Sequence, residues 1–125
     1  MPVNSILGSH YPVHRQKIIK FVQKILDMTT KEFILSTLKS KEKEISKYGI
    51  RAIGLFGSYA RDEQSENSDI DILLDFEPDK ENFDNYMAVC DMIEQMFVNQ
   101  RVEIVTKNGL SPYIGPKILN EAKYV

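Results

Sequence analysis

The sequence predicts an α/β chain in which helices alternate with short strands. Apolar residues recur at helical spacing in three segments, and the run "IRAIGLF" is rich in branched and aromatic residues. In "SDIDILLDF", apolar and polar positions alternate, as expected for a strand. The expected order of elements is α, α, β, α, β, α, β, α.

The composition fits one small domain. The chain has 125 residues, of which 42% are hydrophobic and 27% charged, and this suits a single modest core. A net charge of only −2 lacks the basic surplus of a non-specific nucleic-acid binder, so direct nucleic-acid binding is not expected. The single cysteine, Cys90, excludes an intrachain disulfide, and no signal-peptide pattern or long apolar run occurs. A cytoplasmic protein without membrane association is therefore expected.

Two helices are expected before the first strand. Residues 1–13 are interpreted as an irregular lead-in, and residues 15–28 as an amphipathic helix with a lysine-rich face. The next helix is capped by Thr29 or Thr30 and ends at Gly49, a typical residue after a helix C-terminus. Its apolar positions face one way: Ile34, Leu38, Ile45 and Tyr48.

The remaining helices and strands are expected from residue 50 onward. The strand "IRAIGLF" ends at Gly57, and a short helix is expected from Ser58. Residues 82–98 predict a helix with an apolar stripe, "RVEIVT" predicts a third strand, and Pro112 suits the first turn of a closing helix. The stripe is interpreted mainly as core: Phe83, Tyr86, Met87, Cys90, Ile93 and Phe97.

Polar groups follow or begin the two central strands. Gly57 and Ser58 lie at a strand-to-helix turn, where backbone N–H groups and a hydroxyl suit phosphate oxygens. Asp69 and Asp71 are two apart, so their side chains share a face and can converge on a cation. For each feature alone, a capped turn or a solvated edge residue is the simpler interpretation.

The combination is more specific than its parts. Glu103 lies between Val102 and Ile104 on another short strand, which adds a third acid. Carboxylate oxygens favour Mg²⁺ or Mn²⁺, and such ions can bridge the phosphates of a nucleotide. Three carboxylates beside a phosphate-binding turn indicate metal-assisted phosphoryl or nucleotidyl transfer.

The motif G-S-x10-D-x-D, with "GLFGSYAR" before it and "SDIDILLDF" within it, resembles the nucleotidyltransferase superfamily of DNA polymerase β. In particular, it resembles the minimal nucleotidyltransferase (MNT) proteins, including the antitoxins of HEPN/MNT toxin–antitoxin pairs. The resemblance implies an α/β (α+β) fold with a small nucleotidyltransferase core, in which helices pack a short mixed sheet. It places this domain at residues 31–125, after an N-terminal extension with an amphipathic helix at residues 1–30.

The resemblance also implies roles for individual residues. Gly57, Ser58 and Arg61 would bind the triphosphate of ATP, and Asp69 and Asp71 would be catalytic metal ligands. Glu103 would be the third acid, either as a metal ligand or as the base that accepts a proton from the attacking hydroxyl. The family run Ala-Arg-Gly-Glu is Ala-Arg-Asp-Glu here, with Asp62 in place of glycine.

The implied reaction is AMP transfer from ATP, with Mg²⁺ (or Mn²⁺), to a hydroxyl of a HEPN-type toxin, with tyrosine as the expected acceptor. Two alternatives stay open at this point. The chain could be a non-catalytic antitoxin that neutralises its toxin by binding, or it could adenylylate a small molecule. The sequence also leaves homo-oligomerisation open.

Overall fold

The computed structural model describes residues 15–20 and 29–125. Residues 15–20 are helical, in agreement with the predicted amphipathic helix, whose remaining residues 21–28 lie outside the described residues. The lead-in at residues 1–13 lies outside them as well. The division of the chain at residue 30 therefore stays a prediction.

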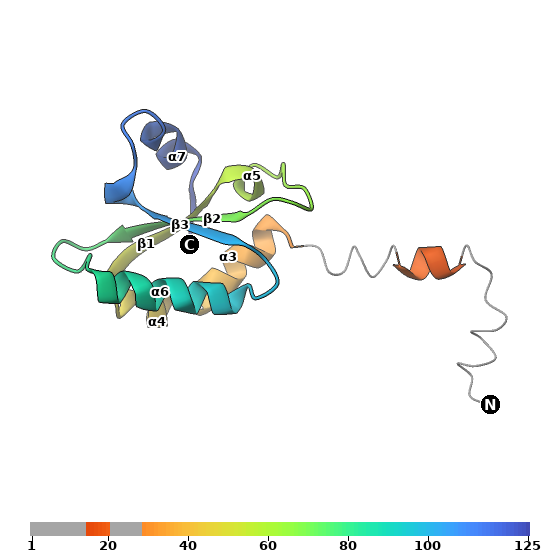
Figure 1. The fold of residues 1–125 in the computed structure, drawn as a ribbon, viewed down its shortest axis with the longest axis horizontal. Helices are drawn as coiled ribbons and strands as arrows, with labels where there is room; N and C mark the ends of the chain where they lie inside the picture. Colours follow the sequence, from red (N-terminus) through yellow and green to blue (C-terminus); the bar gives the residue numbers. More distant parts are fainter. Residues whose placement is uncertain (1–14, 21–28) are drawn as a thin grey trace.

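From residue 29 onward the chain alternates helices and strands, and the core follows the predicted order (Figure 1). The elements are α3 (Lys31–Ser40), α4 (Glu42–Ser46), β1 (Ile50–Phe56), α5 (Gly57–Ala60), β2 (Ile70–Phe76), α6 (Phe83–Met96), β3 (Val102–Thr106), the 3-10 helix η1 (Lys107–Gly109), α7 (Gly115–Glu121) and β4 (Lys123–Tyr124).

The four strands form one mixed sheet in the order β3-β2-β1-β4. β1 pairs antiparallel with both β2 and β4, whereas β2 and β3 are parallel. The crossover from β2 to β3 runs through α6, as a parallel connection requires. The expected α/β fold with a short mixed sheet packed by helices is confirmed.

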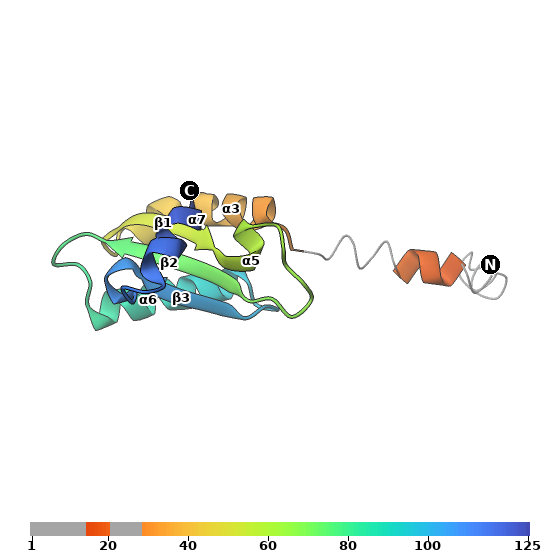
Figure 2. The same ribbon diagram turned by 90° about the horizontal axis from the view of Figure 1, so that it is seen from above.

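Helices lie on both faces of the sheet. Helices α3, α4 and α6 lie on one face, and α5 and α7 on the other (Figures 1 and 2). Alternate residues of β2 face the first layer and form the main core with these helices: Ile70, Ile72, Leu74 and Phe76. Leu73 faces the opposite way and packs with Phe56 and Ile118 of α7 in a smaller cluster. Asp71 and Asp75 differ from Leu73 by two positions, so they face the α7 side.

Local signals explain the beginnings of the helices. The Thr30 hydroxyl accepts a hydrogen bond from Phe33 N at 3.2 Å, and the Asn82 side chain accepts one from Asn85 N at 2.9 Å. Gly49 has φ +87, the left-handed conformation expected after a helix. The predicted single helix is interrupted at Lys41, whose N–H already bonds Leu38 O at 3.1 Å as a C-cap.

Two expectations were wrong. The closing helix starts at Gly115, so Pro116 and not Pro112 lies in its first turn, where a missing N–H is tolerated. On α6, Phe83 is 75% and Met87 40% exposed, so the predicted stripe is core only towards its C-terminal half. Cys90 is buried as predicted. In the part of the chain that the structure describes, no helix is long and apolar enough to span a membrane.

Candidate active site

The turn between β1 and α5 brings the backbone of Gly57 against Asp71. Phe56 lies opposite Asp71 in the β1–β2 register, so Gly57 follows directly beside that carboxylate. A Cβ at Gly57 would overlap with Asp71 Oδ2, and φ is +76, which side chains rarely adopt. Both constraints explain why glycine stands here. A larger residue would not fit at this turn, because the backbone between β1 and α5 lies directly against Asp71.

The parallel pairing of β2 and β3 joins two of the predicted acids. Asp71 and Glu103 are direct register partners, and both face the α7 side of the sheet. Asp69 directly precedes β2 and is half-buried, whereas Glu103 is exposed. The register therefore brings Asp71 and Glu103 side by side on neighbouring strands, and Asp69 lies just before one of them.

The local field at Asp71 is strongly negative. Burial raises the pKa of Asp71 from 3.8 to about 6, with further upward contributions from Glu103, Asp69 and Glu121, against a lowering by Arg61. Each acid makes ionisation of the next less favourable. A cation between these carboxylates would relieve that repulsion.

The carboxylate of Asp69 is paired with a cationic side chain. Its Oδ1 lies 2.9 Å from Arg101 Nε as an ion pair, yet it is buried and has no hydrogen-bond partner. The two observations are compatible because proximity of charges does not ensure hydrogen-bond alignment. Carboxylate oxygens are ligands that hard divalent cations prefer, and at Asp69 such a cation would compete with Arg101.

The three acids are not gathered into a finished metal site. Among the described residues, no group of three or more His, Cys, Asp or Glu side chains is arranged to hold a metal ion. The donor chemistry therefore fits Mg²⁺ or Mn²⁺, while the side chains need rotation to converge on one. Such rotation is accessible to Glu103, because its side chain is exposed.

Arg61 contacts carboxylates at the C-terminal end of α5. Its Nη1 donates to Glu121 Oε1 and Oε2 at 3.1 and 2.9 Å, and its Nε donates to Glu63 at 3.3 Å. Ser58 lies inside α5, between Gly57 and Arg61. Arg61 is thus close to the predicted triphosphate site, but its guanidinium is held by the protein.

Sequence reasoning missed Glu121. Its Oε1 also accepts a hydrogen bond from Gly57 N at 2.9 Å, across 64 positions of the chain. The pKa of Glu121 is lowered overall: burial opposes ionisation, but the Gly57 N–H and Arg61 outweigh it. The one signal in the sequence was that Glu121 is the only acid after Glu103.

The departure at Asp62 leaves the turn intact. Asp62 has φ 57, a left-handed conformation that aspartate adopts at modest cost. Its carboxylate is ion-paired with Lys31 Nζ of α3 at 2.9 Å. Asp62 therefore holds a left-handed conformation that glycine adopts more readily, and the ion pair ties the turn to α3.

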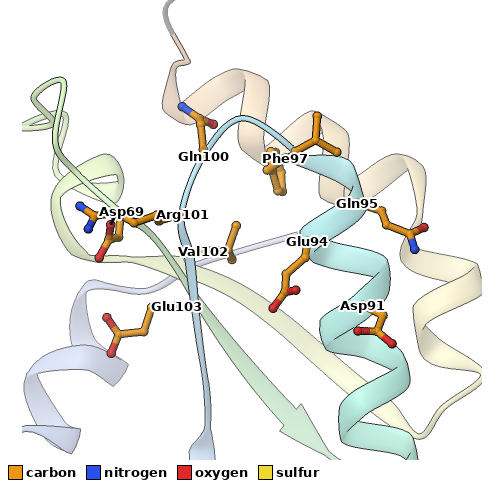
Figure 3. Close-up of a pocket in the computed structure, with 10 residues that line it drawn as sticks. Asp69, Asp91, Glu94, Gln95, Phe97, Gln100, Arg101, Val102 and Glu103 are labelled. Carbon is orange, nitrogen blue, oxygen red and sulfur yellow. Dashed lines mark ion pairs between the residues drawn. The ribbon is translucent and has the colours of Figure 1, made fainter.

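A pocket of about 760 Å³ opens next to the acids, between β3 and the C-terminal half of α6. Figure 3 shows Asp69 and Arg101 together on one side, with Glu103 further along β3 and Glu94 and Asp91 on α6 opposite. Asp69 and Glu103 border this pocket, although the Glu103 side chain is directed to the α7 side of the sheet.

The chain matches a known protein family and several known proteins. The family described as "Polymerase beta, Nucleotidyltransferase" matches residues 32–125. "Protein adenylyltransferase MntA" of Thermococcus cleftensis is 38% identical over 99 residues, covering 78% of this chain and 98% of the relative. A relative from Methanocaldococcus jannaschii, whose name also contains the words protein adenylyltransferase, is 35% identical over 102 residues, covering 78% of this chain and 100% of its own.

Solved structures share the fold. A protein described as a minimal nucleotidyltransferase superposes with a TM-score of 0.66 at 27% identity, covering 78% of this chain and 97% of the other. A toxin–antitoxin crystal structure with AMP-PNP has a TM-score of 0.53 at 22% identity, covering 68% of this chain and 69% of the other. At that identity the second structure supports the fold alone.

Proposed function

This chain belongs to the polymerase β-type nucleotidyltransferase family, and we propose that it transfers AMP from ATP to a hydroxyl of a partner protein. The acceptor we propose is a tyrosine of a HEPN-type ribonuclease toxin, for which the chain acts as antitoxin. The naming of the Thermococcus relative as a protein adenylyltransferase supports a protein acceptor. The toxin comes from the resemblance of the motif, and the structural neighbour with AMP-PNP is described as a toxin–antitoxin structure.

One observation carries the proposal. Asp71 lies between a left-handed glycine turn on one neighbouring strand and the register partner Glu103 on the other. This arrangement puts a turn that has no side chain next to carboxylates that repel one another. A nucleotide triphosphate with divalent cations has the complementary shape and charge.

The protein groups have separate tasks in this scheme. Asp69, Asp71 and Glu103 would hold Mg²⁺ or Mn²⁺, which supplies positive charge to neutralise the phosphates during the transfer. Gly57 lets the triphosphate approach the backbone, and Ser58 presents its hydroxyl and N–H groups to it. Glu103 is exposed at the pocket, where it can also accept the proton of an incoming hydroxyl.

The reaction is an in-line displacement at the α-phosphorus. The acceptor oxygen forms a bond to phosphorus, the bond to the pyrophosphate oxygen breaks, and the acceptor proton leaves to a base or to water. The protein chiefly supplies position and electric field. An acceptor on a macromolecule suits the open pocket beside Asp69 and Glu103.

Intact mass spectrometry of the protein encoded beside this chain tests the proposal. After incubation with this chain, ATP and Mg²⁺, the partner should gain the mass of one or more AMP units. The Asp69→Asn/Asp71→Asn variant should give no gain while retaining the fold by circular dichroism. A stable complex without any mass gain would contradict the catalytic proposal and favour neutralisation by binding.

A further inference from the structure

The Glu121 carboxylate makes contacts with both ends of helix α5. At one end, Glu121 Oε1 accepts from Gly57 N at 2.9 Å, the first residue of that helix. At the other end, both Glu121 oxygens accept from Arg61 Nη1, at 3.1 and 2.9 Å. Arg61 is the C-cap of α5 and donates its own N–H to Gly57 O and Ser58 O, at 3.2 Å each. The contacts form a closed loop around Ser58.

Helix α5 needs support of this kind. It has four residues, which is one turn, and a single turn is not stable by its own hydrogen bonds. Its first residue also holds a left-handed φ of +76. Tyr59 and Ala60 anchor one side in the main core. The other side, which carries the Gly57 N–H, faces α7.

The position of Glu121 is unfavourable for the stability of its own helix, α7. Glu121 is the last residue of α7, where the helix dipole disfavours a negative charge. The side chain is only 16% exposed, so its charge is partly desolvated as well. Charge-assisted hydrogen bonds from Arg61 and Gly57 offset these costs. An acid at this position therefore benefits α5 and not α7.

Resting on the proposed function, we propose that Glu121 is a positioning residue for nucleotide binding: by joining Gly57 and Arg61 across α5, it fixes Ser58 in the geometry that receives the triphosphate. In this arrangement Arg61 acts through Glu121 and the turn, and its guanidinium is not the main phosphate contact. The C-terminal helix thereby becomes part of the nucleotide site, although Glu121 lies 60 positions beyond Arg61 and 64 beyond Gly57.

Three variants separate the contacts. Glu121→Ala removes both contacts, and Glu121→Gln keeps an acceptor oxygen for the Gly57 N–H but loses the charge that pairs with Arg61. Glu63→Gln is the matched control, because Glu63 also contacts Arg61, at 3.3 Å, but does not reach Gly57. The probe is α,β-methylene-ATP with Mg²⁺, and its dissociation constant is measured by calorimetry far below each variant's Tm.

Glu121→Ala should weaken binding of the analogue about tenfold or more, since it removes charge-assisted hydrogen bonds that order the site. Glu121→Gln should fall between Glu121→Ala and the wild type, and Glu63→Gln should match the wild type. Amide exchange at Gly57 should be faster in Glu121→Ala than in Glu121→Gln while exchange in the core of β2 is the same in both variants, whereas a general loss of stability would speed exchange at both places.

The outcomes separate this inference from the proposed function. Equal affinity of the wild type and Glu121→Ala would overturn the role of Glu121 alone. Tighter binding by Glu121→Ala would also overturn it, because the carboxylate would then be a competitor of the phosphate. No binding of the analogue by the wild type would overturn the proposed function and, with it, the nucleotide role of Glu121. If Glu121→Ala does not fold, the comparison of Glu121→Gln with Glu63→Gln decides.

Discussion

The two ends of β2 carry the same residue type in opposite electrostatic surroundings. Asp75, near the end of the strand, is ion-paired with Arg51 Nε at 3.2 Å and lies 3.9 Å from Lys107 Nζ. Asp71, four positions earlier on the same face, is surrounded chiefly by Glu103, Asp69 and Glu121. One aspartate is neutralised by the protein, and the other is kept in a negative field. Of these two aspartates, only Asp71 is left with uncompensated negative surroundings, which the proposed cation site requires.

Each of these ends of β2 also lies beside a glycine that flanks β1, and the two glycines have different surroundings. Gly49, before β1, has φ +87, and a Cβ there would overlap with the Lys80 side chain. Gly57, after β1, has φ +76, and its Cβ would overlap with the Asp71 carboxylate. The same backbone conformation packs against a lysine side chain at one end and against the Asp71 carboxylate at the other. Matched substitutions at the two ends therefore separate stability from function.

The largest expected effect is on catalysis. Asp71→Asn should lower AMP transfer about 1,000-fold or more, because it removes charge where the phosphates and cations are stabilised. Asp75→Asn should transfer AMP at close to the wild-type rate. Initial rates of AMP incorporation into the partner protein measure both. Comparable losses in the two variants would break the distinction between the ends of β2.

The next largest effect is expected from substitutions at the two glycines. Gly57→Ala and Gly49→Ala should each lower the free energy of unfolding by about 1–2 kcal/mol, since each forces alanine into a left-handed conformation. Only Gly57→Ala should also abolish transfer, because its methyl group displaces Asp71. Urea unfolding and rate measurements on the same samples test this. Full activity in a folded Gly57→Ala variant would remove Gly57 from the site.

Binding of Mg²⁺ is expected to have a smaller effect, which is on the free energy of unfolding. Mg²⁺ at ten times its dissociation constant should stabilise the wild type by about 1.4 kcal/mol through binding to the folded state. The same Mg²⁺ should stabilise Asp75→Asn equally and leave the Asp69→Asn/Asp71→Asn variant unchanged. Thermal unfolding with Mg²⁺ and with a chelator gives the comparison. A rise in Tm of the double variant would locate the cation elsewhere.

Periodicity predicted much of the fold, because strands and helices here bury one clear face. The alternation in "SDIDILLDF" gave β2 within one residue, and Gly49 marked the end of α4 as expected. Strand β4 was missed: it has two residues, and its pairing with Gly54 and Leu55 depends on where α7 delivers the chain. A sequence of that length has no period to detect.

The site residues that lie close together in the sequence could be predicted, whereas the one that lies far from them in the sequence could not. Gly57, Ser58, Asp69 and Asp71 fall within fifteen consecutive residues, and their geometry follows from two adjacent strands. Glu103 was expected because it is flanked by apolar residues on a short strand. Glu121 reaches Gly57 only through tertiary packing, and neither periodicity nor spacing encodes a contact across 64 positions.

The smallest expected effect is on stability, and the two aspartates should give opposite signs. The pKa of Asp71 is 3.8 in the unfolded reference and about 6 in the fold. Below about pH 4 it is protonated in both states, and above about pH 6 it is ionised in both, so folding becomes less favourable as pH rises between these values. Asp71→Asn removes this cost. Without metal, it should be more stable than the wild type at pH 7, by about 1 kcal/mol after solvent screening.

At pH 3.5 that gain should vanish, because the wild-type carboxyl is then neutral as well. Asp75→Asn should instead lose about 1 kcal/mol at pH 7, since its ion pairs with Arg51 and Lys107 disappear. Chemical unfolding at both pH values in the presence of a chelator measures the signs. If Asp71→Asn were the less stable variant at pH 7, the negative field would be compensated by contacts within the chain, and repulsion among the acids would no longer argue for a cation.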